Sequence, residues 1–138
     1  MLRYMLDTNL CIRVLRDRPR SLRQRFNDEG EALCISTIVL TELLYGAEKS
    51  ARPAENRREV LAFAARLDVL PFDTAAASHA AEIRRTLERL GQPIGGYDVL
   101  IAGHARSRGL TVVTGNLREF HRVGGLRAED WLAEGGSD

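Results

Sequence analysis

The chain has 138 residues, a length that fits one compact domain and leaves no room for a second folded unit of ordinary size. Its 44% hydrophobic and 28% charged residues, with a formal net charge of +1, exclude a disordered, collagenous or disulfide-scaffold protein and a strongly charged one. No apolar run approaches the roughly 18 residues of a membrane span, and Asp7 interrupts the first apolar stretch before a signal-peptide core develops, so we predict a cytoplasmic protein.

Apolar runs typical of buried strands alternate along the chain with segments of helical periodicity. In chain order we expect a strand at residues 2–6, helices at 10–15 and 21–26 around Pro19, a strand at 32–35, helices at 38–45 and 53–67, a strand at 69–72, helices at 74–90 and 97–108, and a strand at 110–114. The remainder reads as irregular, apart from a short strand near Leu126.

This alternation predicts an α/β domain with a mostly parallel sheet, which we assign to residues 1–132, followed by a flexible tail at 133–138. In such sheets ligands bind beyond the carboxyl ends of the strands. Polar residues that directly follow a strand are therefore the first candidates for chemistry.

Two stretches are rich in arginine. Residues 13–25 carry six arginines against one aspartate, and residues 106–127 carry five against one glutamate. Such stretches can neutralise RNA phosphates, but arginine outnumbers lysine 19 to 1 across the chain, so they also fit ordinary solvated faces. Cys11 and Cys34 lie in apolar stretches without zinc spacing and read as reduced core residues.

Acidic and amide side chains recur where the predicted strands end. Asp7 follows the first strand, Glu42 lies on the helix after the second, Asp98 begins the helix after a Gly-Gly turn, and Asn116 follows the strand that ends near Thr114. Three carboxylates gathered at one sheet edge repel one another, so they hold protons or bind a cation. Oxygen ligands without a Cys or His set favour Mg²⁺ or Mn²⁺ over zinc.

Each acid also has a purely structural interpretation. Asp7 fits the cap of the first helix, Glu42 a solvated helix position and Asp98 the positive end of a helix dipole. The three histidines lack the spacing of a zinc pair, and His104 reads as a packing residue.

Short motifs in chain order resemble the PIN-domain ribonucleases, in particular the VapC toxins of type II toxin–antitoxin systems. The matching motifs are Tyr4-Met5-Leu6-Asp7-Thr8-Asn9, Ser36 with Thr41-Glu42-Leu43 and Gly46, Ile94-Gly95-Gly96-Tyr97-Asp98, Leu100-Ile101-Ala102-Gly103-His104-Ala105, and Val113-Thr114-Gly115-Asn116 with Glu119-Phe120 and Trp131. The resemblance implies a PIN-like three-layer fold, with a five-stranded, mostly parallel sheet flanked by helices.

The resemblance also implies a site for one or two Mg²⁺ or Mn²⁺ ions, with Asp7 and Asp98 as the principal ligands and Glu42 completing the set. Many PIN domains have Asp where this chain has Asn116, and a neutral amide binds a cation more weakly. Glu119 could supply the missing charge through water, or it could be a surface helix residue.

A metal held by these acids would activate water against a phosphodiester and leave a 5′-phosphate and a 3′-hydroxyl, as the resemblance implies. Whether Glu42 binds the metal or orients the water stays open. The side chains expected to donate hydrogen bonds to the ligands or to orient the substrate are those of Thr8, Asn9, Thr114 and Asn116.

The resemblance further implies a toxin that cleaves structured RNA such as tRNA and inhibits translation. A cognate VapB-like antitoxin would neutralise it, and a homodimer and a higher assembly with the antitoxin are expected. A phosphoacceptor domain or a haloacid-type phosphatase fits poorly, since position 9 is Asn rather than a second acid and Lys49 is the sole lysine. A non-catalytic RNA- or protein-binding module is the alternative.

Overall fold

The computed structural model describes residues 1–17 and 20–132. Pro19, the neighbouring Arg18 and the predicted tail at 133–138 lie outside this range. The strands are β1 (Tyr4–Leu6), β2 (Leu33–Ser36), β3 (Asp68–Leu70), β4 (Thr111–Val113) and β5 (Ala128–Glu129). The helices are α1 (Thr8–Leu15), α2 (Arg20–Asp28), α3 (Thr37–Glu48), α4 (Pro53–Ala64), α5 (Thr74–Arg89), α6 (Gly96–Ser107) and α7 (Leu117–Phe120), with a 3-10 turn at Gly30–Ala32.

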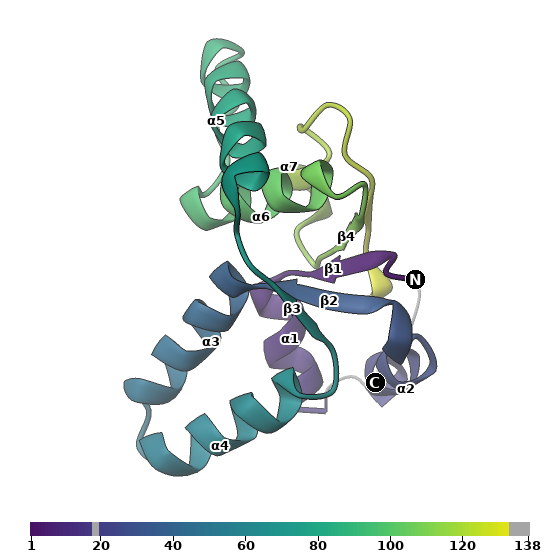
Figure 1. The fold of residues 1–138 in the computed structure, drawn as a ribbon, viewed down its shortest axis with the longest axis vertical. Helices are drawn as coiled ribbons and strands as arrows, with labels where there is room; N and C mark the ends of the chain where they lie inside the picture. Colours follow the sequence, from purple (N-terminus) through teal and green to yellow (C-terminus); the bar gives the residue numbers. More distant parts are fainter. Residues whose placement is uncertain (18–19, 133–138) are drawn as a thin grey trace.

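Within the described residues the strands form one five-stranded sheet of order β3-β2-β1-β4-β5, and every pair is parallel. The sheet separates two helical layers, with α1, α3 and α4 on one side and α5 and α6 on the other (Figure 1). The predicted α/β class and the five-stranded parallel sheet are therefore confirmed. No helix among the described residues is long and apolar enough to cross a membrane.

Strand β1 is the central strand of the sheet, with β2 on one side and β4 on the other, and its three residues are all buried. Met5 is in register with Cys34 of β2 and with Val112 of β4. The backbone N–H of Asp7 donates to the carbonyl of Val113, which extends the ladder one residue beyond β1. Asp7 therefore leaves the sheet at the middle of its carboxyl edge.

The segment after β4 differs from the irregular chain that we predicted. It contains the short helix α7, which was not predicted, whereas the strand predicted near Leu126 is confirmed as β5, which begins two residues beyond it. A four-residue helix is too short for a periodic apolar pattern, and Phe120 and Trp131 in this segment are buried by tertiary packing. Helix α4 ends at Ala64 and not near Leu67, because a turn returns the chain to β3.

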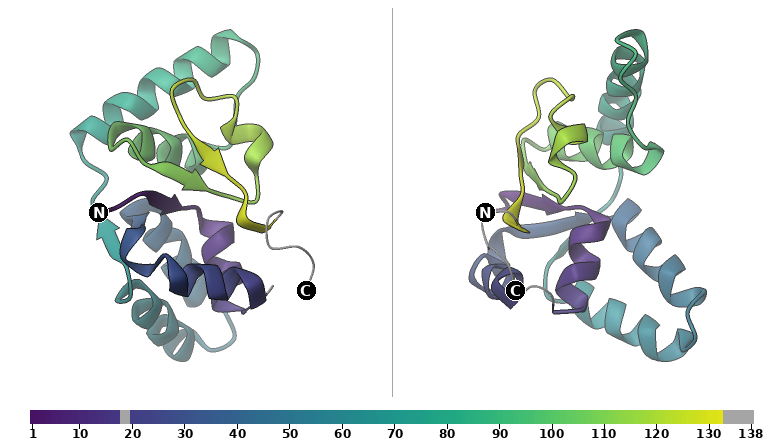
Figure 2. Two further views of the ribbon diagram at one scale, coloured as in Figure 1. Left: turned by 90° about the vertical axis from the view of Figure 1, so that its right-hand side faces the viewer. Right: turned by 180° about the vertical axis from the view of Figure 1, so that it is seen from behind.

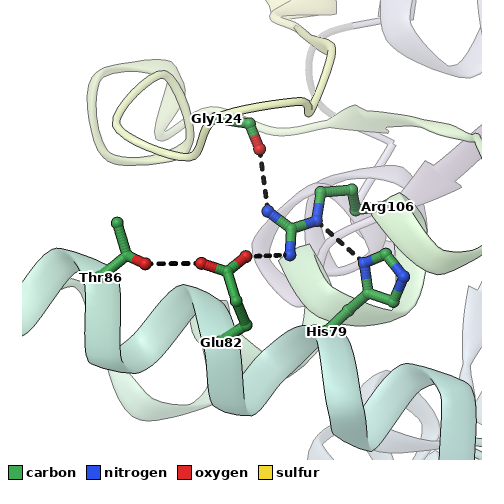
Figure 3. A network of polar contacts seen from close by, with 5 residues as sticks. All are labelled: His79, Glu82, Thr86, Arg106 and Gly124. Atoms are coloured by element: carbon green, nitrogen blue, oxygen red, sulfur yellow. Dashed lines mark hydrogen bonds and ion pairs between the residues drawn. The ribbon is translucent and has the colours of Figure 1, made fainter.

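Helices α5 and α6 pack closely against each other over the β4 side of the sheet (Figure 2). A Cβ atom placed on Gly103 of α6 would lie 2.5 Å from the backbone nitrogen of Ala80 on α5, so only glycine permits this approach. Arg106 further links the layer: it donates to the carboxylate of Glu82 on α5 and to the carbonyl of Gly124 (Figure 3). Helix α6, which carries Asp98, is thus firmly fixed.

Candidate functional site

The side chain of Asp7 is fixed by hydrogen bonds from two neighbouring segments. Asp7 is the N-cap of α1, and its Oδ1 accepts a 2.9 Å bond from the backbone N–H of Leu10. Its Oδ2 accepts a 2.5 Å bond from the hydroxyl of Thr114, which follows β4. Only 4% of Asp7 is exposed. The capping role and the predicted site role therefore belong to the same side chain.

Glu42 reaches the same edge from α3. Its Oε1 accepts a short hydrogen bond from the hydroxyl of Thr8, the first residue of α1. Helix α3 starts at this edge because Ser36, the last residue of β2, caps it and accepts a 3.1 Å bond from the N–H of Ile38. The half-buried Glu42 is thus held beside the residue that follows Asp7.

Asp98 lies in the first turn of α6 and Glu119 in α7, and their carboxyl groups are within hydrogen-bonding contact. Burial, followed by this contact and by the charges of Asp7, Glu119 and Glu42, raises the pKa of Asp98 to about 6. Two carboxyl groups in such contact are stable when they share one proton. The structure therefore places Glu119 of α7 beside the predicted ligand Asp98.

The pKa of Asp7 is also raised. Burial is the largest cause, and the charges of Glu42 and Asp130 add to it, while the bonds from Thr114 and Leu10 act in the opposite direction. Asp130 was missed in the sequence. It directly follows β5, as Asp7 follows β1, so a firmer prediction of that last strand would have singled it out.

We define the acidic cluster as Asp7, Glu42, Asp98, Glu119 and Asp130. All its ligand atoms would be hard carboxylate oxygens, so its chemistry fits Mg²⁺ or Mn²⁺. In the part of the chain that the structure describes, no three acidic, His or Cys side chains stand around a common point at which a metal ion could be held. Their oxygens instead contact Thr114, Thr8 and one another. Binding a cation would therefore require these side chains to rearrange.

Two predicted orienting residues lie outside this set of contacts. Asn9 is exposed on α1. Asn116 precedes α7 without a side-chain capping bond, and its backbone N–H donates a 2.8 Å bond to the Thr114 hydroxyl. Thr114 therefore links the backbone of Asn116 to the carboxylate of Asp7.

Several arginines of the two basic stretches have structural partners. Arg122 and Arg127 donate to backbone carbonyls, those of Pro93 and Gly109, and the Arg25 guanidinium lies 4.4 Å from the ring centroid of Trp131. Arg16, which caps the C-terminus of α1, and Arg118 on α7 are exposed. These two exposed arginines are suited to contact phosphate.

Comparisons with known proteins agree on one family. The PIN domain model matches residues 4–126. The chain is 55% identical over 131 residues to the tRNA(fMet)-specific endonuclease VapC of Shigella flexneri, covering 95% of this chain and 99% of that protein. It is 46% identical over 132 residues to Ribonuclease VapC2 of Haemophilus influenzae, with 96% and 100% covered.

Solved structures give the same result. A chain of the DNA-bound VapBC crystal structure from Salmonella typhimurium matches with a TM-score of 0.92 at 55% identity, covering 96% of this chain and all of that one. VapBC2 from Rickettsia felis, bound to a promoter DNA fragment, matches with a TM-score of 0.89 at 35% identity, over 95% of this chain and all of that one.

Proposed function

Because this chain belongs to the PIN-domain family and is a homologue of its VapC ribonuclease toxins, we propose that it is a Mg²⁺- or Mn²⁺-dependent endoribonuclease in which the acidic cluster is the active site. The observation that carries the proposal is the gathering of acidic side chains at the carboxyl edge of the sheet, where Thr114 holds Asp7 and Thr8 holds Glu42, and where burial raises the pKa of Asp7 and Asp98. Each carboxylate is destabilised by burial and by the charges of the others, and a divalent cation would remove that repulsion.

Asp7 and Asp98 are the proposed principal ligands, and Glu42 completes the set or orients the attacking water. Held by these residues, a divalent ion would supply an activated water molecule and positive charge beside the phosphate. The chain's own part is to hold the ligands. Thr114 and the N–H of Leu10 fix both oxygens of Asp7, and Thr8 fixes Glu42.

Glu119 has a proposed supporting role beside Asp98. Since Asn116 supplies no charge at its position, Glu119 adds the negative charge that balances the cation, directly or through water. Hydrolysis by water would leave a 5′-phosphate and a 3′-hydroxyl and needs no ribose 2′-hydroxyl as nucleophile.

The proposed substrate is a structured RNA, with tRNA first, because two relatives at 55% identity are named tRNA(fMet)-specific endonucleases. Cleavage of an initiator or other tRNA stops translation, which fits a toxin that acts in the cytoplasm. The exposed Arg16 and Arg118 would contact the phosphates of the folded RNA.

A VapB-like antitoxin is the proposed partner, since the similar solved structures are VapBC complexes. We also assign a homodimer and a higher assembly with the antitoxin. Large apolar side chains are exposed in two places. Tyr45 of α3 and Leu61 of α4 form one pair; Leu90, directly after α5, and Tyr97 of α6 form the other. Two separate apolar surfaces are thus available, one for the homodimer interface and one for the antitoxin.

The proposal is tested by incubating the purified chain with tRNA and Mn²⁺, then with excess EDTA. We expect cleavage that EDTA abolishes, with 5′-phosphate ends, and a loss of about 100-fold or more in Asp7→Asn and Asp98→Asn. Asp68→Asn is the matched control, because Asp68 is exposed on the edge strand β3. Full cleavage by a folded Asp7→Asn protein, or RNA binding without cleavage by the wild type, would exclude this active site.

A further inference from the structure

His104 is buried within α6, and among the described residues its side-chain hydrogen bond and ring contact go to Ser36 and Phe72, not to the acidic cluster. Both His104 and Ser36 are 0% exposed, and the His104 Nδ1 and Ser36 Oγ atoms are 2.8 Å apart. In the described residues no partner for the Nε2 atom of the same ring is found. An imidazole that leaves one nitrogen unpaired in the core needs a reason, because burying such a group costs stability.

The hydrogen bond joins the two helices that carry Glu42 and Asp98. Ser36 caps α3, and Glu42 lies six residues further along that helix. His104 lies on α6, six residues beyond Asp98. Helices α3 and α6 lie on opposite sides of the sheet (Figure 1), so the bond crosses from one helical layer to the start of the other.

The Ser36 hydroxyl has two roles at the same time. It accepts from the backbone N–H of Ile38, which caps α3, and its own hydrogen is available to Nδ1 of a neutral His104 ring. Burial lowers the pKa of His104, which keeps the ring neutral at neutral pH.

Phe72 contacts both His104 and the first turn of α3. The ring of Phe72 packs edge-on against His104 with centroids 5.5 Å apart, and the Phe72 backbone N–H donates a 3.1 Å bond to the Thr37 hydroxyl. Thr37 is the first residue of α3. The first turn of α3 is thus held both by α6 and by the segment that leads into α5.

From this geometry we infer that His104 is a positioning residue: its hydrogen bond to Ser36 sets the distance between α3 and α6, and so between Glu42 and Asp98. The inference rests on the proposed function, because it concerns how the acidic cluster is held together. His104 would act through Ser36, and not by binding the metal ion or the substrate itself.

The test measures Mn²⁺ binding directly, by the electron paramagnetic resonance signal of free Mn²⁺, alongside kcat and KM for tRNA cleavage. His104→Leu places an apolar side chain of similar size in the core and removes the bond. We expect Mn²⁺ binding to weaken about tenfold and kcat to fall by a similar factor, with KM for RNA unchanged within about twofold. His104→Asn, whose amide takes the place of Nδ1, should restore both to within about threefold of wild type.

Two further variants separate positioning from general stability. Leu87→Ala leaves a cavity in the buried face of α5, so it should lower stability while Mn²⁺ affinity stays within about twofold. Adding His104→Leu to Ser36→Ala should weaken Mn²⁺ binding no further than Ser36→Ala does alone, because both changes break the same bond.

The inference is overturned if His104→Leu binds Mn²⁺ like the wild type, if Leu87→Ala weakens binding equally, or if the two changes are additive. A wild-type chain that binds Mn²⁺ but leaves RNA intact refutes the proposed function instead, and the binding measurements still decide the role of His104. Wild-type cleavage together with unchanged Mn²⁺ binding in His104→Leu refutes the positioning role alone.

Discussion

Thr114 and Asp7 lie 107 positions apart in the chain, yet the Thr114 hydroxyl donates a 2.5 Å hydrogen bond to Oδ2 of Asp7. The two residues follow β4 and β1, which are hydrogen-bonded neighbours in the sheet. The same hydroxyl accepts from the backbone N–H of Asn116. One buried threonine therefore fixes both a proposed metal ligand and the start of the loop that leads to Glu119.

Thr114→Val removes that donor but keeps the shape of the side chain. Because the Asp7 carboxylate and the Asn116 N–H then lose a buried partner, we expect the free energy of unfolding to fall by about 1–3 kcal/mol. Urea unfolding of the metal-free protein measures this change. Thr114→Ser keeps the hydroxyl and should lose less. A Thr114→Val variant as stable as the wild type, with a loss only in Thr114→Ser, would mean that the methyl group, and not the bond, is what matters.

Gly103→Ala tests the close packing of α5 on α6. The added Cβ would meet the backbone of Ala80 at 2.5 Å, so we expect a loss of about 1–3 kcal/mol or more in the free energy of unfolding. Gly46→Ala is the matched control: Gly46 lies within helix α3 with nothing within 4 Å of the added atom, and this change should stabilise by about 0.5–1 kcal/mol. A neutral Gly103→Ala would show that the two helices can separate freely.

The folding stability should fall on mild acidification because of His104. Burial lowers its pKa below 6.5, with Asp73 raising it and Arg108 lowering it further. The unfolded chain therefore binds a proton near pH 6.5 that the folded chain binds only at lower pH. This contribution is complete above pH 6.5 and is lost as the pH falls through 6.5 toward the folded pKa.

The check compares urea midpoints of the wild type and His104→Asn between about pH 8 and about pH 5.5. The wild type should lose more stability over this range, since Asn has no proton to bind. Parallel curves would exclude His104 as the source of the dependence.

Mn²⁺ should stabilise the fold through the acidic cluster. At about 100 times the dissociation constant, a ligand that binds only the folded state adds about 2.7 kcal/mol to the free energy of unfolding. Calorimetry should show this rise in the wild type and its loss in Asp98→Asn, and EDTA should reverse it. The same rise in Asp98→Asn would place the bound ion elsewhere.

Arg118 should contact an RNA phosphate, because it is exposed and precedes Glu119 of the acidic cluster. Arg118→Gln should weaken tRNA binding about equally for all sequences and reduce the slope of log affinity against log salt by about 1. Fluorescence anisotropy with labelled tRNA measures both quantities. Arg85→Gln, at an exposed position on α5, is the control and should leave them unchanged.

Most elements of the fold could be predicted from local patterns. Residues 2–6 and 110–114 are apolar runs, and the structure has β1 and β4 there. Asp73 caps the start of α5. Gly91, just beyond the end of that helix, adopts a φ of +70°, a conformation that favours glycine. Helix α7 was harder to predict, since four residues give no periodicity, and the sequence left open whether Glu119 joins the acids or lies on a surface helix.

The sequence by itself singled out Asp7 and Asp98 as candidates, because Asp7 follows an apolar strand and Asp98 begins a helix after a Gly-Gly turn, and both signals are local. It gave no access to Asp130, to the contact between Asp98 and Glu119, or to the bond between His104 and Ser36. Those relationships join residues far apart in the chain. They exist only once the strand order and the packing of the helices on the sheet have brought these segments together, which no local pattern encodes.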